Sequence, residues 1–191
     1  MFNDFKGFDE QGQPIKISVP PTLLISSIGV IQDAKKAVSI DAKFEGDSVY
    51  VLGNTNDELG GSEYFAMKGE ELRGKKFIGN SVPKVNAEEN IRTYRALSRA
   101  IQEELVASAI SVHRGGLGIA LAKTAMAGGL GMNIDLGNVP IWDIDLDLRS
   151  DHLLYSESQG RVVVTVNPEY KGRFEGLMSG NQIVYSEVGK V

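Results

Sequence analysis

Ser48-Val49-Tyr50-Val51-Leu52 runs directly into Gly53-Asn54-Thr55-Asn56-Asp57-Glu58-Leu59-Gly60-Gly61-Ser62-Glu63-Tyr64. The first stretch is apolar and rich in β-branched residues, which predicts a short buried strand. The second is small, polar and acidic, and Gly60 and Gly61 allow positive φ and close approach to the backbone. Because α/β proteins place ligands in loops at strand ends, this loop is either a ligand-facing segment or a polar turn between two elements.

The first half of the chain otherwise indicates mainly extended structure. Residues 1–21 carry two glycines and three prolines without an apolar period, which predicts an extended arm. The stretch from Thr22 to Ile31 is β-rich and nearly all apolar, like a strand buried on both faces. Ala37 to Asp41 predicts a further strand.

A long amphipathic helix follows. Asn86 is a good N-cap, and Glu89 three residues later completes a capping-box pattern. Residues of the expected buried stripe then recur at spacings of three and four, which predicts a helix of about six turns over residues 87–108. The stripe consists of Ile91, Tyr94, Leu97, Ile101, Leu105 and Ser108.

Strands and helices alternate after this helix. Gly115 to Gly129 predicts a glycine-bracketed helix whose small residues allow close packing. Asn167-Pro168 has the N-cap and N1 residues of another helix. The expected strands are Ala109 to His113, Leu130 to Leu136, Arg161 to Val166 and Gln182 to Val188. The fold class is therefore α/β (α+β), with a mixed β-sheet packed with helices.

Composition excludes several classes of protein. The 191 residues are 42% hydrophobic, enough for an ordinary core. The net charge of −5 gives no electrostatic case for nucleic acid or an anionic membrane. The chain has no cysteine, which fits a cytosolic protein. No apolar run approaches the roughly 20 residues that span a bilayer, and the N-terminus lacks a signal-peptide pattern.

Three other patterns suggest chemistry only weakly. Gly115-Gly116-x-Gly118 lacks the full dinucleotide-binding spacing, so close helix packing explains it better. Asp143, Asp145 and Asp147 alternate with apolar residues but lack the glycine and glutamate of a calcium loop. The two histidines, His113 and His152, form no zinc-binding pair, so we expect no metal site here.

Four segments resemble one family in the same order along the chain. They are Pro20 to Gly29, Gly53 to Tyr64, Gly115 to Leu136 and Tyr155 to Val166, and Glu-Leu-Gly-Gly-Ser-Glu-Tyr at 58–64 is the most specific. The family is phosphoribosylformylglycinamidine synthase, the purine-pathway ligase. The chain is similar to the C-terminal domain of its second half, a fold shared with aminoimidazole ribonucleotide synthetase. The resemblance implies an arm at 1–21 from the preceding N-terminal domain and a C-terminal-type domain at 22–191, which we expect to be truncated at its C-terminus.

The resemblance also implies a reaction and its partners. The full-length enzyme uses ATP and Mg²⁺ to convert formylglycinamide ribonucleotide and glutamine-derived ammonia to the amidine, with ADP and phosphate. Its partners are a glutaminase subunit and a small accessory subunit, or a fused glutaminase domain, together with sister domains of the same chain. The phosphate-binding and main magnesium-binding motifs lie outside this sequence, so the 191 residues alone are expected to bind no cofactor and to be inactive.

By analogy between the two halves, Glu157-Ser158-Gln159 matches a substrate-contacting segment of the first half. We therefore expect it to meet the loop 55–62 at one edge of the sheet, facing a substrate or a sister domain. No residue of the chain is expected to be catalytic. The candidate site residues are Thr55, Glu58, Gly60, Gly61, Ser62, Glu157, Ser158 and Gln159.

One departure from the family leaves alternatives open. The family usually has His-Asp-x-Ser-Asp/Glu before Gly-Gly-Leu, and this chain instead has Ile110 to Arg114. The pattern fits a half whose pocket is structural, or a divergent branch. The alternatives are a non-catalytic scaffold for domain and subunit packing, or the same domain from a related ATP-using synthetase or kinase. The segment 58–64 argues against the last.

Overall fold

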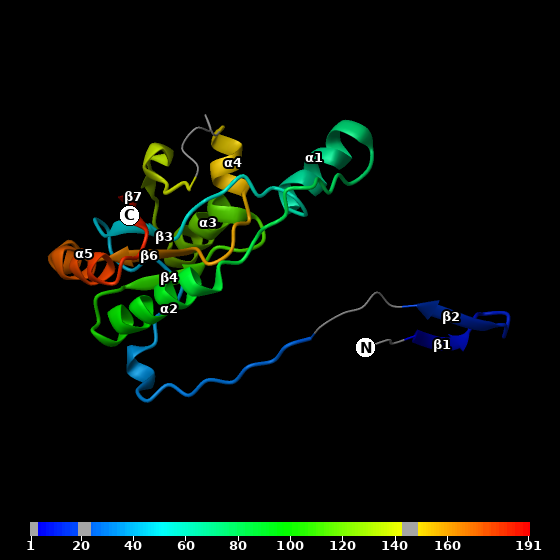
Figure 1. The fold of residues 1–191 in the computed structure, drawn as a ribbon, viewed down its shortest axis with the longest axis horizontal. Helices are drawn as coiled ribbons and strands as arrows, with labels where there is room; N and C mark the ends of the chain where they lie inside the picture. Colours follow the sequence, from blue (N-terminus) through cyan, green and yellow to red (C-terminus); the bar gives the residue numbers. More distant parts are fainter. Residues whose placement is uncertain (1–3, 19–23, 143–148) are drawn as a thin grey trace. The chain divides into compact units, whose positions relative to one another are not determined.

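The computed structural model describes residues 4–18, 24–142 and 149–191 (Figure 1). Contacts divide the chain into two compact units, Met1–Ala34 and Lys35–Val191. The first unit contains an antiparallel hairpin of β1 (Asp4–Phe8) and β2 (Pro14–Ser18), in which Asp4 pairs with Ser18. The hairpin turns at residues 9–13, where Gly12 adopts a φ of 76°.

The second unit is built on a five-stranded sheet in the order β4-β6-β3-β7-β5. Its two central neighbours, β3 (Ser48–Leu52) and β6 (Val162–Val166), are buried along their whole length. The outer strands are β4 (Ser108–Ser111), β7 (Tyr185–Lys190) and the two-residue β5 (Asn133–Ile134). The ladders between these strands are antiparallel, and in the described residues parallel pairing is a single bridge from Thr55 to Ile141.

Helices cover both faces of this sheet, which is why the two central strands are apolar on both faces. On one face, Tyr50 and Leu52 of β3 pack with α2 (Ala87–Gln102) and α5 (Lys171–Gly180). On the other, Val49 and Val51 pack with α3 (Gly116–Gly128). The α/β (α+β) class predicted from the sequence is confirmed.

Two short helices lie beside the site described below. α1 (Glu63–Arg73) projects from the body of this unit (Figure 1), and the sequence analysis did not anticipate it. α4 (Ser150–Tyr155) packs against α3. The single-turn helices are η1 (Ala34–Lys36), η2 (Leu136–Asn138) and η3 (Pro168–Tyr170).

Several expected elements form as the sequence predicts. Asn86 caps α2, because its Oδ1 accepts a hydrogen bond from the Glu89 N–H at 3.3 Å. Asn167 caps η3 in the same way through the Glu169 N–H. Gly129 is the C-cap of α3, and its φ of 64° is the left-handed value expected of a glycine there.

Other expectations were wrong. Residues 24–31 of the expected strand at 22–31 form no strand and are exposed, because no neighbouring strand in the described residues offers hydrogen bonds to them. Residues 37–41 form no strand either. Asn133 and Ile134 are the only strand residues within 130–136, and the last strand begins at Tyr185.

The long helix also differs from its prediction. α2 ends at Gln102, where Glu104 adopts a positive φ of 59° and the chain turns into β4. Its buried face is Thr93, Ala96 and Ala100, one position away from the expected stripe. Leu97 and Ile101 of the expected stripe are partly buried against the same core, and Leu105 and Ser108, beyond the end of the helix, are buried.

Candidate functional site

The antiparallel pairing of β3 with β6 decides where the candidate loops lie. Leu52 at the end of β3 pairs with Val162 at the start of β6. The loop that leaves β3 therefore meets the turn that enters β6. Gly53 and Gly160 sit at this meeting point with φ of 84° and 82°, and a Cβ on Gly53 would lie 3.2 Å from the Gly160 carbonyl oxygen. Glycine allows both the backbone conformation and the close approach.

The two candidate segments are hydrogen-bonded to each other. The Asn56 N–H donates to Ser158 Oγ and the Glu58 N–H donates to Ser156 Oγ, both at 3.0 Å. The Glu157 N–H donates to the Glu58 carbonyl oxygen at 3.2 Å. The structure thus brings together the loop 55–62 and the segment 157–159, as their positions at strand ends led us to expect.

The buried side chain of Arg161 is hydrogen-bonded to both candidate loops, at the junction where the loop after β3 meets the turn before β6. Its side chain is 1% exposed, and its Nη1 donates to Thr55 Oγ1 at 2.8 Å. Its Nη2 donates to the Ser156 carbonyl oxygen at 2.5 Å and its Nε to that of Ser158 at 3.2 Å. Burial lowers the pKa of Arg161 to about 10 against the opposing effect of Glu58, so the guanidinium stays charged at neutral pH.

Glu58 provides the neighbouring negative charge. Its side chain is buried, and Oε1 accepts a hydrogen bond from the Lys84 N–H at 2.9 Å while Oε2 accepts one from Asn56 Nδ2 at 3.4 Å. The carboxylate therefore ties the loop after β3 to the segment that leads into α2. A buried carboxylate is tolerated here because it has hydrogen-bond donors and a nearby guanidinium.

The side chains of Ser62 and Glu157 accept hydrogen bonds from N–H groups at the N-termini of helices. Ser62 is the N-cap of α1, and its Oγ accepts a hydrogen bond from the Phe65 N–H at 3.1 Å. Glu157 Oε1 accepts from the Glu63 N–H at 3.1 Å and from the Gly115 N–H at 2.9 Å. These N–H groups open α1 and α3, where a negative charge is stabilised. One carboxylate oxygen thus joins two helices to the β6 turn.

The remaining candidate residues differ in exposure. Gly60 is buried, and a Cβ there would lie 2.5 Å from the Ser81 carbonyl carbon. Gly61 is exposed with a φ of 76°. Gln159 is exposed, and its Nε2 donates to the Glu157 carbonyl oxygen at 3.1 Å. Of the eight candidates, Gly61 and Gln159 are the most accessible to a ligand.

Metal-binding chemistry has little support in the part of the chain that the structure describes. Within these residues no group of three or more His, Asp or Glu side chains could hold a metal ion. The three alternating aspartates at 143, 145 and 147 lie outside the described residues. His113 is exposed, and His152 Nδ1 lies 3.0 Å from Asp57 Oδ1. Arg114, which follows His113, pairs with Glu63 at the start of α1.

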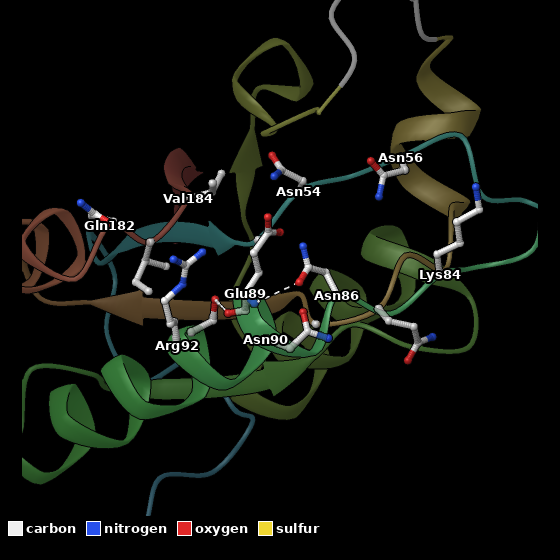
Figure 2. Close-up of a pocket in the computed structure, with 14 residues that line it drawn as sticks. Asn54, Asn56, Lys84, Asn86, Glu89, Asn90, Arg92, Gln182 and Val184 are labelled. Atoms are coloured by element: carbon white, nitrogen blue, oxygen red, sulfur yellow. Dashed lines mark hydrogen bonds between the residues drawn. The ribbon is translucent and has the colours of Figure 1, made fainter.

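A polar groove runs beside these loops. The candidates Thr55, Glu58 and Gln159 line it, whereas its asparagine side chains were not predicted from the sequence as site residues. It consists of two adjoining hollows of about 460 and about 100 Å³. Figure 2 shows the smaller hollow, with side chains from the loop after β3, the start of α2 and the approach to β7.

We call the two hollows together the amide groove. Both hollows are lined by Asn54, Asn56, Lys84, Asn86 and Glu89; the smaller one adds Asn90, Arg92 and Gln182, and the larger one adds Asp57, Glu58, Val85 and Trp142. Asn86 and Glu89 were predicted only as helix-capping residues. The signal that could have revealed the groove is the number of asparagines after β3 and at the start of α2.

Residues 45–191 match the family model described as AIR synthase related protein, C-terminal domain.

The chain belongs to this family.

Its curated relatives are much longer. The chain is 32% identical over 179 residues to phosphoribosylformylglycinamidine synthase subunit PurL of Alkaliphilus metalliredigens, which covers 94% of the chain and 22% of that protein. It is 33% identical over 168 residues to the PurL subunit of Methanocaldococcus jannaschii, covering 87% of the chain and 22% of that protein. The chain therefore spans about a fifth of the length of the curated relatives that it matches.

Solved structures share the fold. A structure of T. maritima PurL complexed with FGAR matches with a TM-score of 0.70 at 23% identity, covering 82% of this chain and 26% of that one. Thiamine-monophosphate kinase from Stenotrophomonas maltophilia matches with a TM-score of 0.53 at 17% identity, covering 81% and 50%. The AIR synthase-type fold thus occurs in both proteins. Among the described residues, no helix has the length and apolar character needed to cross a membrane.

Proposed function

We propose that this chain is the C-terminal-type domain of the second half of a phosphoribosylformylglycinamidine synthase. The whole enzyme would be the ATP-dependent ligase that converts formylglycinamide ribonucleotide and ammonia to formylglycinamidine ribonucleotide. The observation that carries the proposal is the 32% identity to a PurL subunit across 94% of the chain. In this proposal residues 1–21 are an arm from the preceding domain and residues 22–191 are the domain itself.

Within that ligase we propose that ATP and Mg²⁺ are bound mainly by groups of the other domains. No acidic cluster in the described residues fits a magnesium ion, and the candidate loops offer buried, already paired side chains. The proposed partners are a glutaminase subunit or domain, a small accessory subunit and the sister domains, in the cytoplasm. Structures of T. maritima PurL complexed with ATP and of PurLQS from the same organism support ATP binding and an assembly with other subunits for the whole enzyme.

We propose that the candidate residues hold the two loops in position, so that the loops form this domain's side of an interface with a sister domain. Thr55, Glu58, Ser62 and Ser158 are buried and hydrogen-bonded within the chain. This favours the scaffold function over substrate contact for those four side chains. Gly61 and Gln159 are the exposed pair that we propose to face the substrate or the sister domain.

A replacement experiment tests the proposed function. The segment of the A. metalliredigens subunit that aligns with this chain is exchanged for residues 1–191, and the chimaera is expressed in a strain that lacks the synthase. We expect growth without added purine, and loss of growth when Arg161→Met is introduced into the exchanged segment. Failure of a folded, soluble chimaera to restore growth, while the unaltered subunit does, would argue that the chain serves another member of the family.

A further inference from the structure

The amide groove has hydrogen-bonding capacity that the protein does not use. Within the described residues, the side-chain amides of Asn54, Asn90 and Gln182 make no hydrogen bond with another residue. Asn54 and Asn90 are half-buried, so their amides are partly withdrawn from water. Each amide can donate and accept. The groove therefore offers unused donors and acceptors from three segments of the chain, which are the loop after β3, α2 and the approach to β7 (Figure 2).

The charges around the groove nearly cancel. Lys84 and Arg92 are the cations of the lining, and Asp57, Glu58 and Glu89 are the carboxylates. This lining has a slight excess of negative charge, which does not favour a phosphate group. It also differs from an apolar ligand site, because such sites are lined mainly by hydrophobic and aromatic side chains. An uncharged ligand with many polar groups suits the lining best.

One aromatic ring stands at the rim of this polar surface. Trp142 lines the larger hollow and is 66% exposed, and Val85 beside the same hollow is 69% exposed. Trp142 is the only tryptophan of the chain. Trp142 shares this hollow with the Asn54 amide, which is unpaired within the described residues, so the two together present an apolar face and a polar group to one ligand. A sugar ring has both features, because its hydroxyl groups donate and accept while its C–H face is apolar.

We propose that the amide groove binds a neutral sugar ring, with the ring's C–H face against Trp142 and its hydroxyl groups on Asn54 and the neighbouring amides. The larger hollow of about 460 Å³ lies in the size range of small-molecule sites. This binding site goes beyond the proposed ligase function and does not depend on it. The shared chemistry covers a pentose and a hexose, and the probes below distinguish the two.

The test uses the fluorescence of Trp142 in the 191-residue chain. Methyl β-D-ribofuranoside and methyl β-D-glucopyranoside are each titrated as neutral probes, with ATP and inorganic phosphate as charged comparisons. We expect a saturable change in fluorescence with at least one sugar and none with phosphate. Asn54→Leu should weaken sugar binding about 10-fold, the effect of losing one well-made hydrogen bond. Asn133→Leu, an exposed asparagine on β5 outside the groove, is the matched control and should bind as the unaltered chain does.

A second measurement does not depend on the fluorescence of Trp142. In Trp142→Ala, sugar binding is followed by saturation-transfer NMR, and we expect the signal to be lost while the far-UV circular dichroism is unchanged. The proposal is overturned if neither sugar gives a saturable change, if Asn54→Leu and Asn133→Leu behave alike, or if the sugar signal survives in Trp142→Ala. It is equally overturned if ATP binds the groove more tightly than both sugars and competes with them.

Discussion

At the residue scale, the candidate site depends on a few buried charges. Arg161 is the largest fully buried side chain of the described residues, and it holds both loops through Thr55, Ser156 and Ser158. Its charge also faces the buried carboxylate of Glu58. A buried charge in such a network is costly to leave without its partner, because neither water nor another donor replaces it.

We expect Arg161→Met to lower the free energy of unfolding by about 3–5 kcal/mol, because Glu58 would lose its opposite charge and three acceptors would lose their donor. The measurement is urea unfolding followed by circular dichroism. Arg95→Met is the control: Arg95 is an exposed arginine on α2, and its change should stay within about 0.5 kcal/mol. Equal effects of the two substitutions would show that the buried network does not stabilise the junction.

Asp47 also has a buried carboxylate, whose oxygens, unlike those of Glu58, have no hydrogen-bond partner in the described residues. Its side chain is 1% exposed. Burial raises its pKa above the usual value of 3.8. The folded state therefore holds the proton more tightly than the unfolded state does. It follows that the ionised side chain destabilises the fold at neutral pH, and that this penalty disappears as pH falls through the raised pKa.

We expect Asp47→Asn to raise the free energy of unfolding at pH 7 by about 1–3 kcal/mol, because the neutral amide removes the unpaired buried charge of the carboxylate. The advantage over the unaltered chain should shrink as pH falls, because the protonated acid and the amide are then alike in charge. Urea unfolding from pH 7 down to pH 4 measures this. Glu45→Gln, an exposed neighbour, should show no such trend. A gain that is independent of pH would contradict the assignment.

At the element scale, close packing of α3 positions the glycine-rich side of the site. A Cβ on Gly128 would lie 2.2 Å from the Ala42 carbonyl oxygen, whereas one on Gly118 would meet its nearest atoms, in Leu154 and Tyr155, at 3.4–3.5 Å. The close approach expected for Gly118 is therefore ordinary contact, and the tightest contact of the helix is at its end. Small residues at the contact let a helix lie near its neighbour.

We expect Gly128→Ala to destabilise the chain by about 1–3 kcal/mol through overpacking against a backbone atom. Gly118→Ala in the same helix should be neutral or stabilising by up to about 1 kcal/mol, because alanine has the higher helix propensity. Gly118→Leu should again cost about 1–3 kcal/mol. Thermal unfolding of the three variants checks the order, and a Gly118→Ala variant less stable than Gly128→Ala would reverse it.

At the scale of the whole molecule, the chain is about a fifth of the length of its curated relatives. Phosphoryl transfer depends on groups that position phosphates and metal ions. The described residues include no acidic cluster for a metal. In our proposal the domain acts as a framework for groups that other domains of the whole enzyme supply.

We expect the purified 191-residue chain to show no ligase activity and no ATP hydrolysis above the blank. A coupled assay for ADP release measures it, with the full-length A. metalliredigens subunit as the positive control. Steady turnover that is abolished by Glu157→Gln, a change within the chain itself, would contradict the expectation and place catalytic groups in this domain.

The sequence by itself determined the local elements that depend on neighbouring residues. Caps such as Asn86 and Asn167, the glycine end of α3 and the doubly apolar strands β3 and β6 follow from side-chain chemistry within a few positions. The segment at 58–64 also carried the family resemblance, which the match over residues 45–191 confirmed. These features need no knowledge of distant contacts.

Only the tertiary structure decided which polar side chains remain available to bind a ligand. The pairing of Leu52 with Val162 brings the two candidate loops together, and hydrogen bonds within the chain then occupy the Thr55 and Ser158 hydroxyl groups that the sequence predicted as ligand contacts. The amide groove forms only because α2 starts beside that junction, and residues 24–31 remain exposed despite their apolar composition. Burial and hydrogen bonding between residues about a hundred positions apart are set by packing, which local patterns do not specify.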